Sequence, residues 1–220
     1  MRHLIDFGDL TRAEWESLYQ RCSDIMDHPA DFMDACRGRV MASLFYEPST
    51  RTNFSFQTAM LRVGGTVFGF ADPKSTSTAK GETLKDTIKM VSGYADVVVM
   101  RNPKEGAAKA ASLYSDVPVI NAGDGGHMHP TQTTADLTTI TRLRGKVDGL
   151  SVGLCGDLKN GRTVHSLIKA LAKFEGINFF LIAPRELAVP EYMRAFMREH
   201  GMWFTEVTGL EAVIPQLDVL

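Results

Sequence analysis

Short apolar segments alternate with amphipathic segments along nearly the whole chain. The apolar segments are typical of buried strands and lie at residues 39–45, 66–70, 96–100, 118–121, 150–155, 178–182, 203–207 and 217–220. The segments with helical periodicity lie at residues 11–26, 52–63, 83–94, 105–114, 131–144, 162–174 and 190–200. Strands that alternate with helices form parallel βαβ units. The sequence therefore predicts an α/β fold with doubly wound parallel sheets.

Charge and cysteine content exclude several classes of protein. The 220 residues carry a net charge of −2, which gives no basic surface for nucleic acid. No apolar run approaches the ~20 residues of a membrane span, and the N-terminus lacks the apolar core of a signal peptide. Cys22, Cys36 and Cys155 are too scattered for a zinc ribbon or a disulfide framework. We therefore expect a cytoplasmic protein with reduced thiols and no membrane or nucleic-acid partner.

Polar side chains follow five of the expected strands, at the point where each strand ends. These segments are residues 47–52, residues 75–82, Arg101, residues 123–132 and residues 156–163. In open parallel sheets, ligands bind beyond the carboxyl ends of the strands. Because all five segments would meet at that edge, the pattern favours an enzyme that handles an anion.

The segment Ser49-Thr50-Arg51-Thr52 stands directly before a helical segment and is suited to a phosphate. A helix N-terminus offers unpaired N–H groups and partial positive charge. The hydroxyls add donors, and Arg51 can pair with two phosphate oxygens at once. Taken alone, the segment is equally an ordinary helix cap with a surface arginine.

Five further side chains are candidates, each with an ordinary structural alternative. Lys80 can reach an anion as a point charge, or be a solvated loop lysine. Arg101, at the end of a buried strand, and Arg162, at a helix start, can clamp anionic groups or face solvent. His129 can donate to a carbonyl oxygen and Gln132 can hold an amide or amine, although lone residues of this kind are mostly structural.

Other site classes lack their motifs. A metal pair of His127 and His129 has no third ligand nearby in the sequence. The GxGxxG order is absent, so Gly156-Asp157 is weak support for a dinucleotide site. Neither GxxxxGK[ST] nor GxSxG occurs, which argues against a P-loop enzyme and an α/β-hydrolase.

Taken together, these motifs resemble those of the aspartate/ornithine carbamoyltransferases. The order and spacing agree over nearly the whole chain, and the matching segments are Phe45 to Thr52, Lys80 to Thr83, Met100-Arg101, Gly123-Asp124-Gly125, His129 to Gln132, and residues 156–166. The Lys80-Gly81-Glu82 loop and Gly156-Asp157-Leu158-Lys159 are similar to the aspartate branch rather than the ornithine branch.

The resemblance implies transfer of the carbamoyl group of carbamoyl phosphate to the amine of L-aspartate, in pyrimidine synthesis, with no metal or organic cofactor. The implied contacts are Ser49, Thr50, Arg51 and Thr52 at the phosphate, Arg101 and His129 at the carbamoyl oxygen, Gln132 at the carbamoyl nitrogen, and Arg162 at an aspartate carboxylate. It also implies that Lys80 and Ser77, or Ser75 in another alignment, enter a neighbouring subunit's site. We therefore expect a homotrimer, with regulatory or other pathway subunits as possible partners.

These roles fit the chemistry of the reaction. Attack by an amine builds negative charge on the carbamoyl oxygen, which Thr52, Arg101 and His129 would stabilise as an oxyanion-hole-type cluster. Arg51 and Lys80 would stabilise the departing phosphate. The rest is the positioning of two substrates, which requires no covalent intermediate.

Two features depart from the family pattern. The family commonly has Arg and Glu where this chain has Asn53 and Gln57, so an amide pair is expected in place of an ion pair. The family also continues well beyond residue 220. We therefore expect a carbamoyl-phosphate-binding domain at residues 1–135 and an incomplete aspartate-binding domain at residues 136–220.

If the aspartate site is incomplete, residues 1–220 by themselves should bind carbamoyl phosphate weakly and turn over little or nothing. Two alternatives remain open from the sequence. One is a carbamoyl-phosphate-binding or oligomer-forming fragment without turnover. The other is a carbamoyltransferase that uses a different amine acceptor.

Overall fold

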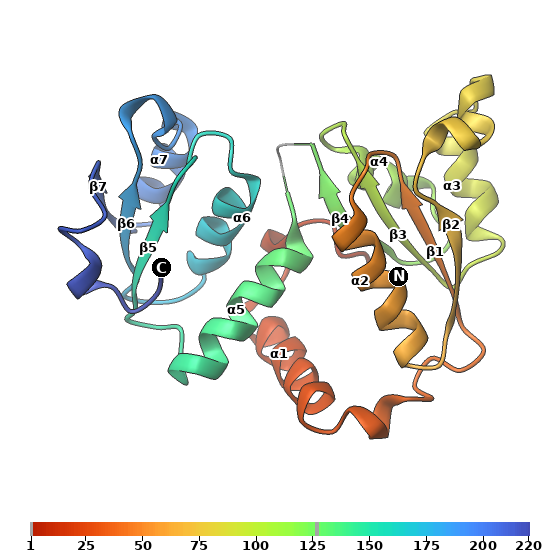
Figure 1. Cartoon of the computed structure of the whole chain (residues 1–220), viewed down its shortest axis with the longest axis horizontal. Helices are drawn as coiled ribbons and strands as arrows, with labels where there is room; N and C mark the ends of the chain where they lie inside the picture. The colour runs from red at the N-terminus through yellow and green to blue at the C-terminus, as the bar shows by residue number, and fades with distance from the viewer. Residues whose placement is uncertain (1, 126–127) are drawn as a thin grey trace.

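The chain forms two separate parallel sheets, shown side by side in Figure 1. The structure is a computed structural model that describes residues 2–125 and 128–220. The first sheet has the order β2-β1-β3-β4 and consists of β1 (Val40–Phe45), β2 (Thr66–Phe70), β3 (Val97–Asn102) and β4 (Val119–Asp124). The second has the order β5-β6-β7 and consists of β5 (Ser151–Cys155), β6 (Asn178–Ile182) and β7 (Trp203–Val207). Every pairing within the two sheets is parallel, which confirms the expected α/β fold.

Seven α-helices are found in the described residues: α1 (Arg12–Asp27), α2 (Thr50–Arg62), α3 (Leu84–Ser92), α4 (Ala107–Tyr114), α5 (Pro130–Arg144), α6 (Arg162–Leu171) and α7 (Glu191–Glu199). Helices α2, α3 and α4 lie with the first sheet, α6 and α7 with the second, and α5 runs between them (Figure 1). The capping box of Thr11 and Glu14 that starts α1 is confirmed. On α3, Ile88 and Val91 are buried while Lys85 is exposed, as the periodicity predicted.

The central strand β1 is buried on both faces, which fixes the start of the loop that follows it. Ala42 and Leu44 pack in one apolar cluster, and Met41 and Phe45 pack in another. Burial on both faces is the usual environment of a parallel strand covered by helices. Each large side chain buried in this way contributes roughly 1.5–3 kcal/mol. The loop after Phe45 therefore begins from a rigid point.

The prediction of a strand at residues 217–220 is wrong. Only Val219 forms a bridge, with Val152 of β5, so no ladder of consecutive pairs defines a strand. The Asp218 carboxylate instead accepts a hydrogen bond from the Ser151 backbone N–H. The segment lies beside β5, but it does not form the strand that its apolar pattern predicted.

The N-terminal segment connects the two sheets, a feature that its sequence did not predict. Leu4 forms a parallel bridge with Ile120 of β4. A few residues later, Phe7 and Trp15 are buried in the apolar cluster of the second sheet. One short segment thus ties β4, in the first sheet, to the core of the second.

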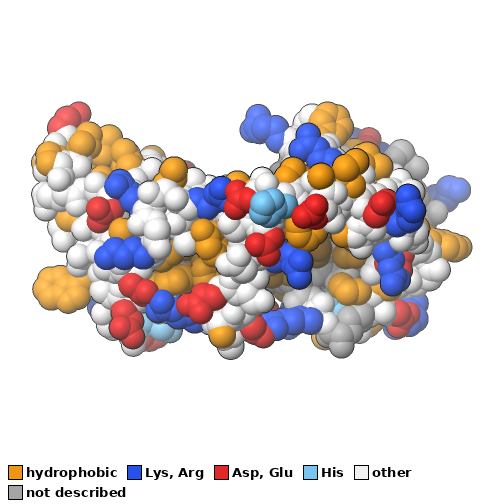
Figure 2. Space-filling view, turned by 90° about the horizontal axis from the view of Figure 1, so that it is seen from below, with side chains coloured by type: hydrophobic (Ala, Val, Ile, Leu, Met, Phe, Trp, Pro, Cys, Tyr) orange, Lys and Arg blue, Asp and Glu red, His pale blue; other side chains and the backbone are white. Residues whose placement is uncertain are grey.

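The molecular surface agrees with the small net charge of the chain. In the view of Figure 2, acidic and basic side chains are mixed rather than gathered into a patch of one sign. Among the helices of residues 2–125 and 128–220, none combines the length and apolar character that a membrane span requires.

Candidate active site

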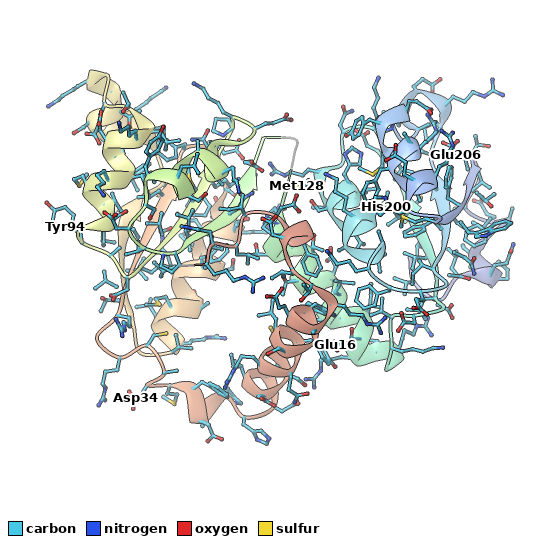
Figure 3. The ribbon with its side chains drawn as sticks, turned by 180° about the vertical axis from the view of Figure 1, so that it is seen from behind. Glu16, Asp34, Tyr94, Met128, His200 and Glu206 are labelled. Carbon is cyan, nitrogen blue, oxygen red and sulfur yellow. The ribbon has the colours of Figure 1, made fainter. Side chains whose placement is uncertain are left out.

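Gly123, in β4, marks the point at which three cationic or polar side chains meet. A Cβ atom placed on Gly123 would lie 3.3 Å from Nη1 of Arg101, 3.4 Å from Cδ2 of His129 and 3.6 Å from Cζ of Arg162. Arg101 lies in β3, His129 caps α5 and Arg162 is the first residue of α6. Three candidates from separate parts of the sequence thus share one region between the sheets. Met128, next to His129, is labelled there in Figure 3.

Glu47 holds the two arginines in this cluster. Its Oε1 accepts a hydrogen bond from Nε of Arg101 at 2.6 Å and lies 3.9 Å from Nη1 of Arg162. Arg162 also donates to the Gly125 carbonyl oxygen. Burial, and next the positive charge of Arg101, lower the pKa of the Arg162 guanidinium. Two arginines around Glu47 in a partly desolvated region attract an anion.

Sequence reasoning assigned no role to Glu47. The sequence signal for Glu47 was its position, since it follows β1 and is the first residue of the polar segment 47–52. A second residue that went unassigned is Asp124, which is buried at the end of β4. Its carboxylate accepts hydrogen bonds from the backbone N–H groups of Gly106 and Met128, and so anchors the approach to His129.

His129 is held as a neutral hydrogen-bond donor. Its Nδ1 accepts from the Gln132 backbone N–H at 3.4 Å, as the cap of α5. This assigns the ring proton to Nε2. Burial, and then the charges of Arg162 and Arg101, lower the pKa of His129 to about 4. At neutral pH the imidazole can therefore donate from Nε2 without carrying charge.

The low pKa of His129 predicts that the unfolding free energy depends on pH. The His129 pKa falls on folding from an ordinary 6.5 to about 4, so between these values the unfolded chain takes up a proton that the folded chain refuses. The matched variant is His129→Asn, which keeps a capping side chain but does not titrate. Between pH 7 and pH 4, the unfolding free energy of the wild type should fall by up to about 3 kcal/mol more than that of the variant. Urea unfolding of both proteins across this range is the measurement. Parallel pH dependences would contradict the assigned pKa.

A second group of candidates lines a cavity of about 330 Å³ where the starts of α2 and α5 face each other. The lining residues are Thr52, Ser55, Phe56, Ala59, His129, Thr131, Gln132 and Ala135. His129 therefore belongs both to this cavity and to the cluster at Gly123. Thr52 and Gln132, from opposite helices, are brought together as the motifs predicted.

The first turn of α2 has the features of an anion site. Ser49 is the N-cap residue, yet its side chain makes no capping hydrogen bond. The backbone N–H groups at the start of a helix have no partner within it. Thr50 and Arg51 are exposed on this turn and do not line the cavity, so Thr52 is the member of the segment that the structure joins to His129.

The expected amide pair near this turn is confirmed. Oδ1 of the buried Asn53 accepts from Nε2 of Gln57 at 2.7 Å and from Oγ of Ser43 at 2.8 Å. Ser43 lies in β1, so the network ties α2 to the central strand. The segment that contains Ser49 to Thr52 is thus connected to the sheet through the next turn of α2.

Ser77 and Lys80 do not join this cluster within the chain. Both are exposed in a short 3₁₀ helix, Ser77–Lys80. Ser77 lines a different cavity together with Tyr94, which Figure 3 labels at the outer end of the first sheet, far from Met128. The side chain of Ser75, the alternative to Ser77, and residue His127 lie outside the described parts of the structure.

Fold and site together define an α/β protein in which two arginines and a histidine gather near the carboxyl ends of parallel strands. Within residues 2–125 and 128–220, no group of three or more His, Cys, Asp or Glu side chains is arranged to hold a metal ion. Residues 2–142 match the family model "Aspartate/ornithine carbamoyltransferase, carbamoyl-P binding domain". The chain belongs to this family.

Known relatives place it in the aspartate branch. The chain is 53% identical over 220 residues to the aspartate carbamoyltransferase catalytic subunit of Clostridium botulinum, covering 100% of this chain and 72% of the relative. The corresponding subunit of Clostridium perfringens is 52% identical with the same coverage.

Solved structures agree. The catalytic subunit of M. jannaschii aspartate transcarbamoylase superposes with a TM-score of 0.93 at 44% identity, covering 100% of this chain and 72% of that one. Aspartate transcarbamoylase from Trypanosoma cruzi, in complex with carbamoyl phosphate and aspartate, gives 0.91 at 36% identity, covering 99% and 71%.

Proposed function

We infer that this protein transfers the carbamoyl group of carbamoyl phosphate to the amino group of L-aspartate. The products are N-carbamoyl-L-aspartate and phosphate, in the de novo synthesis of pyrimidines. The observation that carries the inference is the meeting of Arg101, His129 and Arg162 around Gly123, next to the cavity lined by Thr52 and Gln132. The relatives named as aspartate carbamoyltransferases support the same reaction.

The geometry supports a division of roles within the site. Nε2–H of His129 and the guanidinium of Arg101 donate to the carbamoyl oxygen, where negative charge builds up as the amine attacks. Ser49, Thr50, Arg51 and the N–H groups of the first turn of α2 bind the phosphate. Because Glu47 holds Arg101 and the cap of α5 holds His129, these two donors need little reorganisation during the reaction.

Two further residues complete the proposed site. Gln132 faces the carbamoyl nitrogen from within the cavity. Arg162 binds a carboxylate of aspartate, in exchange for its contact with Glu47. The carbamoyl carbon lies between His129 and the phosphate-binding turn. Attack by the neutral amine forms the C–N bond, the C–O bond to phosphate breaks, and the proton lost by the amine passes to the departing phosphate.

We also propose that the protein acts as a homotrimer in the cytoplasm. Ser77 and Lys80 are exposed away from the cluster of their own chain, which fits a role in the site of a neighbouring subunit. Lys80 would then assist phosphate departure and contact aspartate across the interface. Regulatory or other pathway subunits would be additional partners.

The test is product formation by the polypeptide as its gene encodes it, with aspartate or ornithine as acceptor. We expect carbamoyl aspartate to form, and carbamoyl ornithine to be absent or slower by orders of magnitude. Faster carbamoylation of ornithine would overturn the acceptor, and failure to consume carbamoyl phosphate with either amine would overturn the function.

A further inference from the structure

Asp136 holds the amide of Gln132 in one orientation. Nε2 of Gln132 donates to Oδ1 of Asp136 at 2.9 Å, one turn further along α5. Gln132 also lines the cavity that it shares with Thr52 and His129. Its side chain therefore contacts Asp136 on one side and borders the proposed substrate region on the other.

The orientation of this amide has a chemical consequence. A primary amide presents a donor on nitrogen and an acceptor on oxygen, in different directions from the same carbon. An ionised carboxylate can only accept, so Asp136 takes the nitrogen end. Oε1 is then the free end of the Gln132 amide, and it is an acceptor for an N–H group in the cavity.

We propose that Asp136 is a positioning residue that makes Gln132 select the amino group of the carbamoyl donor. This inference rests on the proposed function and identifies how its site distinguishes a carbamoyl from an acyl group. A carbamoyl nitrogen carries two N–H donors, one of which pairs with Oε1. A methyl group in the same place leaves the oxygen unpaired, which costs affinity.

An ordinary surface pair provides the comparison. On α1, Nε2 of Gln20 donates to Oδ1 of Asp24 at 3.0 Å with the same spacing along the helix. Such pairs stabilise a helix by only about 0.2–0.5 kcal/mol. The pair on α5 differs because Gln132 borders the cavity with His129, and because burial raises the pKa of Asp136. Asp136 is half-buried and acts on the cavity through Gln132, without lining the cavity itself.

The experiment compares two stable phosphonates that differ in one group. Phosphonoacetamide carries an amino group where acetonylphosphonate carries a methyl group. By calorimetry, the wild type should bind phosphonoacetamide about tenfold more tightly, the value of one hydrogen bond. Asp136→Ala should reduce this preference to about threefold or less, because the amide of Gln132 is free to turn. Asp136→Asn, which keeps an accepting oxygen, should restore it.

Two controls separate positioning from a general loss of structure. Asp24→Ala removes the matched carboxylate on α1 and should leave the tenfold preference intact. Affinity for inorganic phosphate should be the same in all four proteins, because it does not depend on the amide. A tenfold preference that persists in Asp136→Ala would overturn the positioning role.

The wild type separates failure of this inference from failure of the proposed function. If it binds inorganic phosphate and both phosphonates equally, the selection by Gln132 is refuted while the phosphate site stands. If it binds none of the three, the proposed function fails and the inference fails with it.

Discussion

Arg51→Ala is expected to weaken the binding of carbamoyl phosphate by about 100-fold or more. A guanidinium that pairs with two phosphate oxygens makes two charge-assisted hydrogen bonds, each stronger than a neutral one. Arg51 is exposed in the first turn of α2, and alanine is the best helix former, so the fold should be unaffected. Calorimetry with phosphonoacetamide measures the affinity, and thermal unfolding measures the stability.

Arg62→Ala is the matched control for charge. Arg62 is also exposed on α2, but it is in the last turn, distant from the first turn, and does not line the cavity. Its replacement removes the same unit of positive charge and should change the affinity less than about threefold, because exposed charges at a distance are screened by salt. Unchanged binding in Arg51→Ala would show that the first turn of α2 is not the phosphate site.

Periodicity and capping were sufficient to predict most of the fold. The strands at Thr66–Phe70, Asn178–Ile182 and Trp203–Val207 agree with the sequence at both ends, because each is a short apolar run bounded by turn residues. The segment at residues 217–220 has the same local pattern but forms one bridge. The local pattern of a segment indicates its preference for a strand, whereas strand pairing also depends on which neighbouring strand the tertiary fold places beside it.

The sequence identified candidate residues of the site, but not the contacts that hold them together. Arg101 lies near the end of β3, His129 and Arg162 follow β4 and β5, and the rule for parallel sheets brings strand ends together. No local pattern reports that Glu47 bridges two of these arginines, because the contact joins residues from three separate segments.

The links between the two sheets were equally hidden. Phe7 packs in the core of the second sheet, although Leu4, only three residues earlier in the sequence, pairs with a strand of the first sheet. The apolar character of a residue predicts that it is buried, but not in which of the two cores. Contacts of this kind require the tertiary arrangement of the whole chain.

Gly123→Ala should impair both stability and binding, since Gly123 occupies the centre of the cluster. Its φ of +113° is a backbone conformation that an L side chain rarely adopts. The strain should lower the unfolding free energy by about 1–3 kcal/mol. The added methyl would also lie within 3.6 Å of Arg101, His129 and Arg162. Displacing one of these donors should weaken phosphonoacetamide binding by about 10-fold to 100-fold.

The two effects can be separated with a second glycine. Gly145 follows α5 with a φ of +74°, and a Cβ atom there would meet nothing within 4 Å. Gly145→Ala should therefore lower the unfolding free energy by about 1 kcal/mol and leave the affinity unchanged. If Gly123→Ala were destabilised in the same way but bound phosphonoacetamide as tightly as the wild type, the carbonyl oxygen of the ligand would not lie among the three side chains. Glycine would then be required at position 123 only because of its backbone conformation.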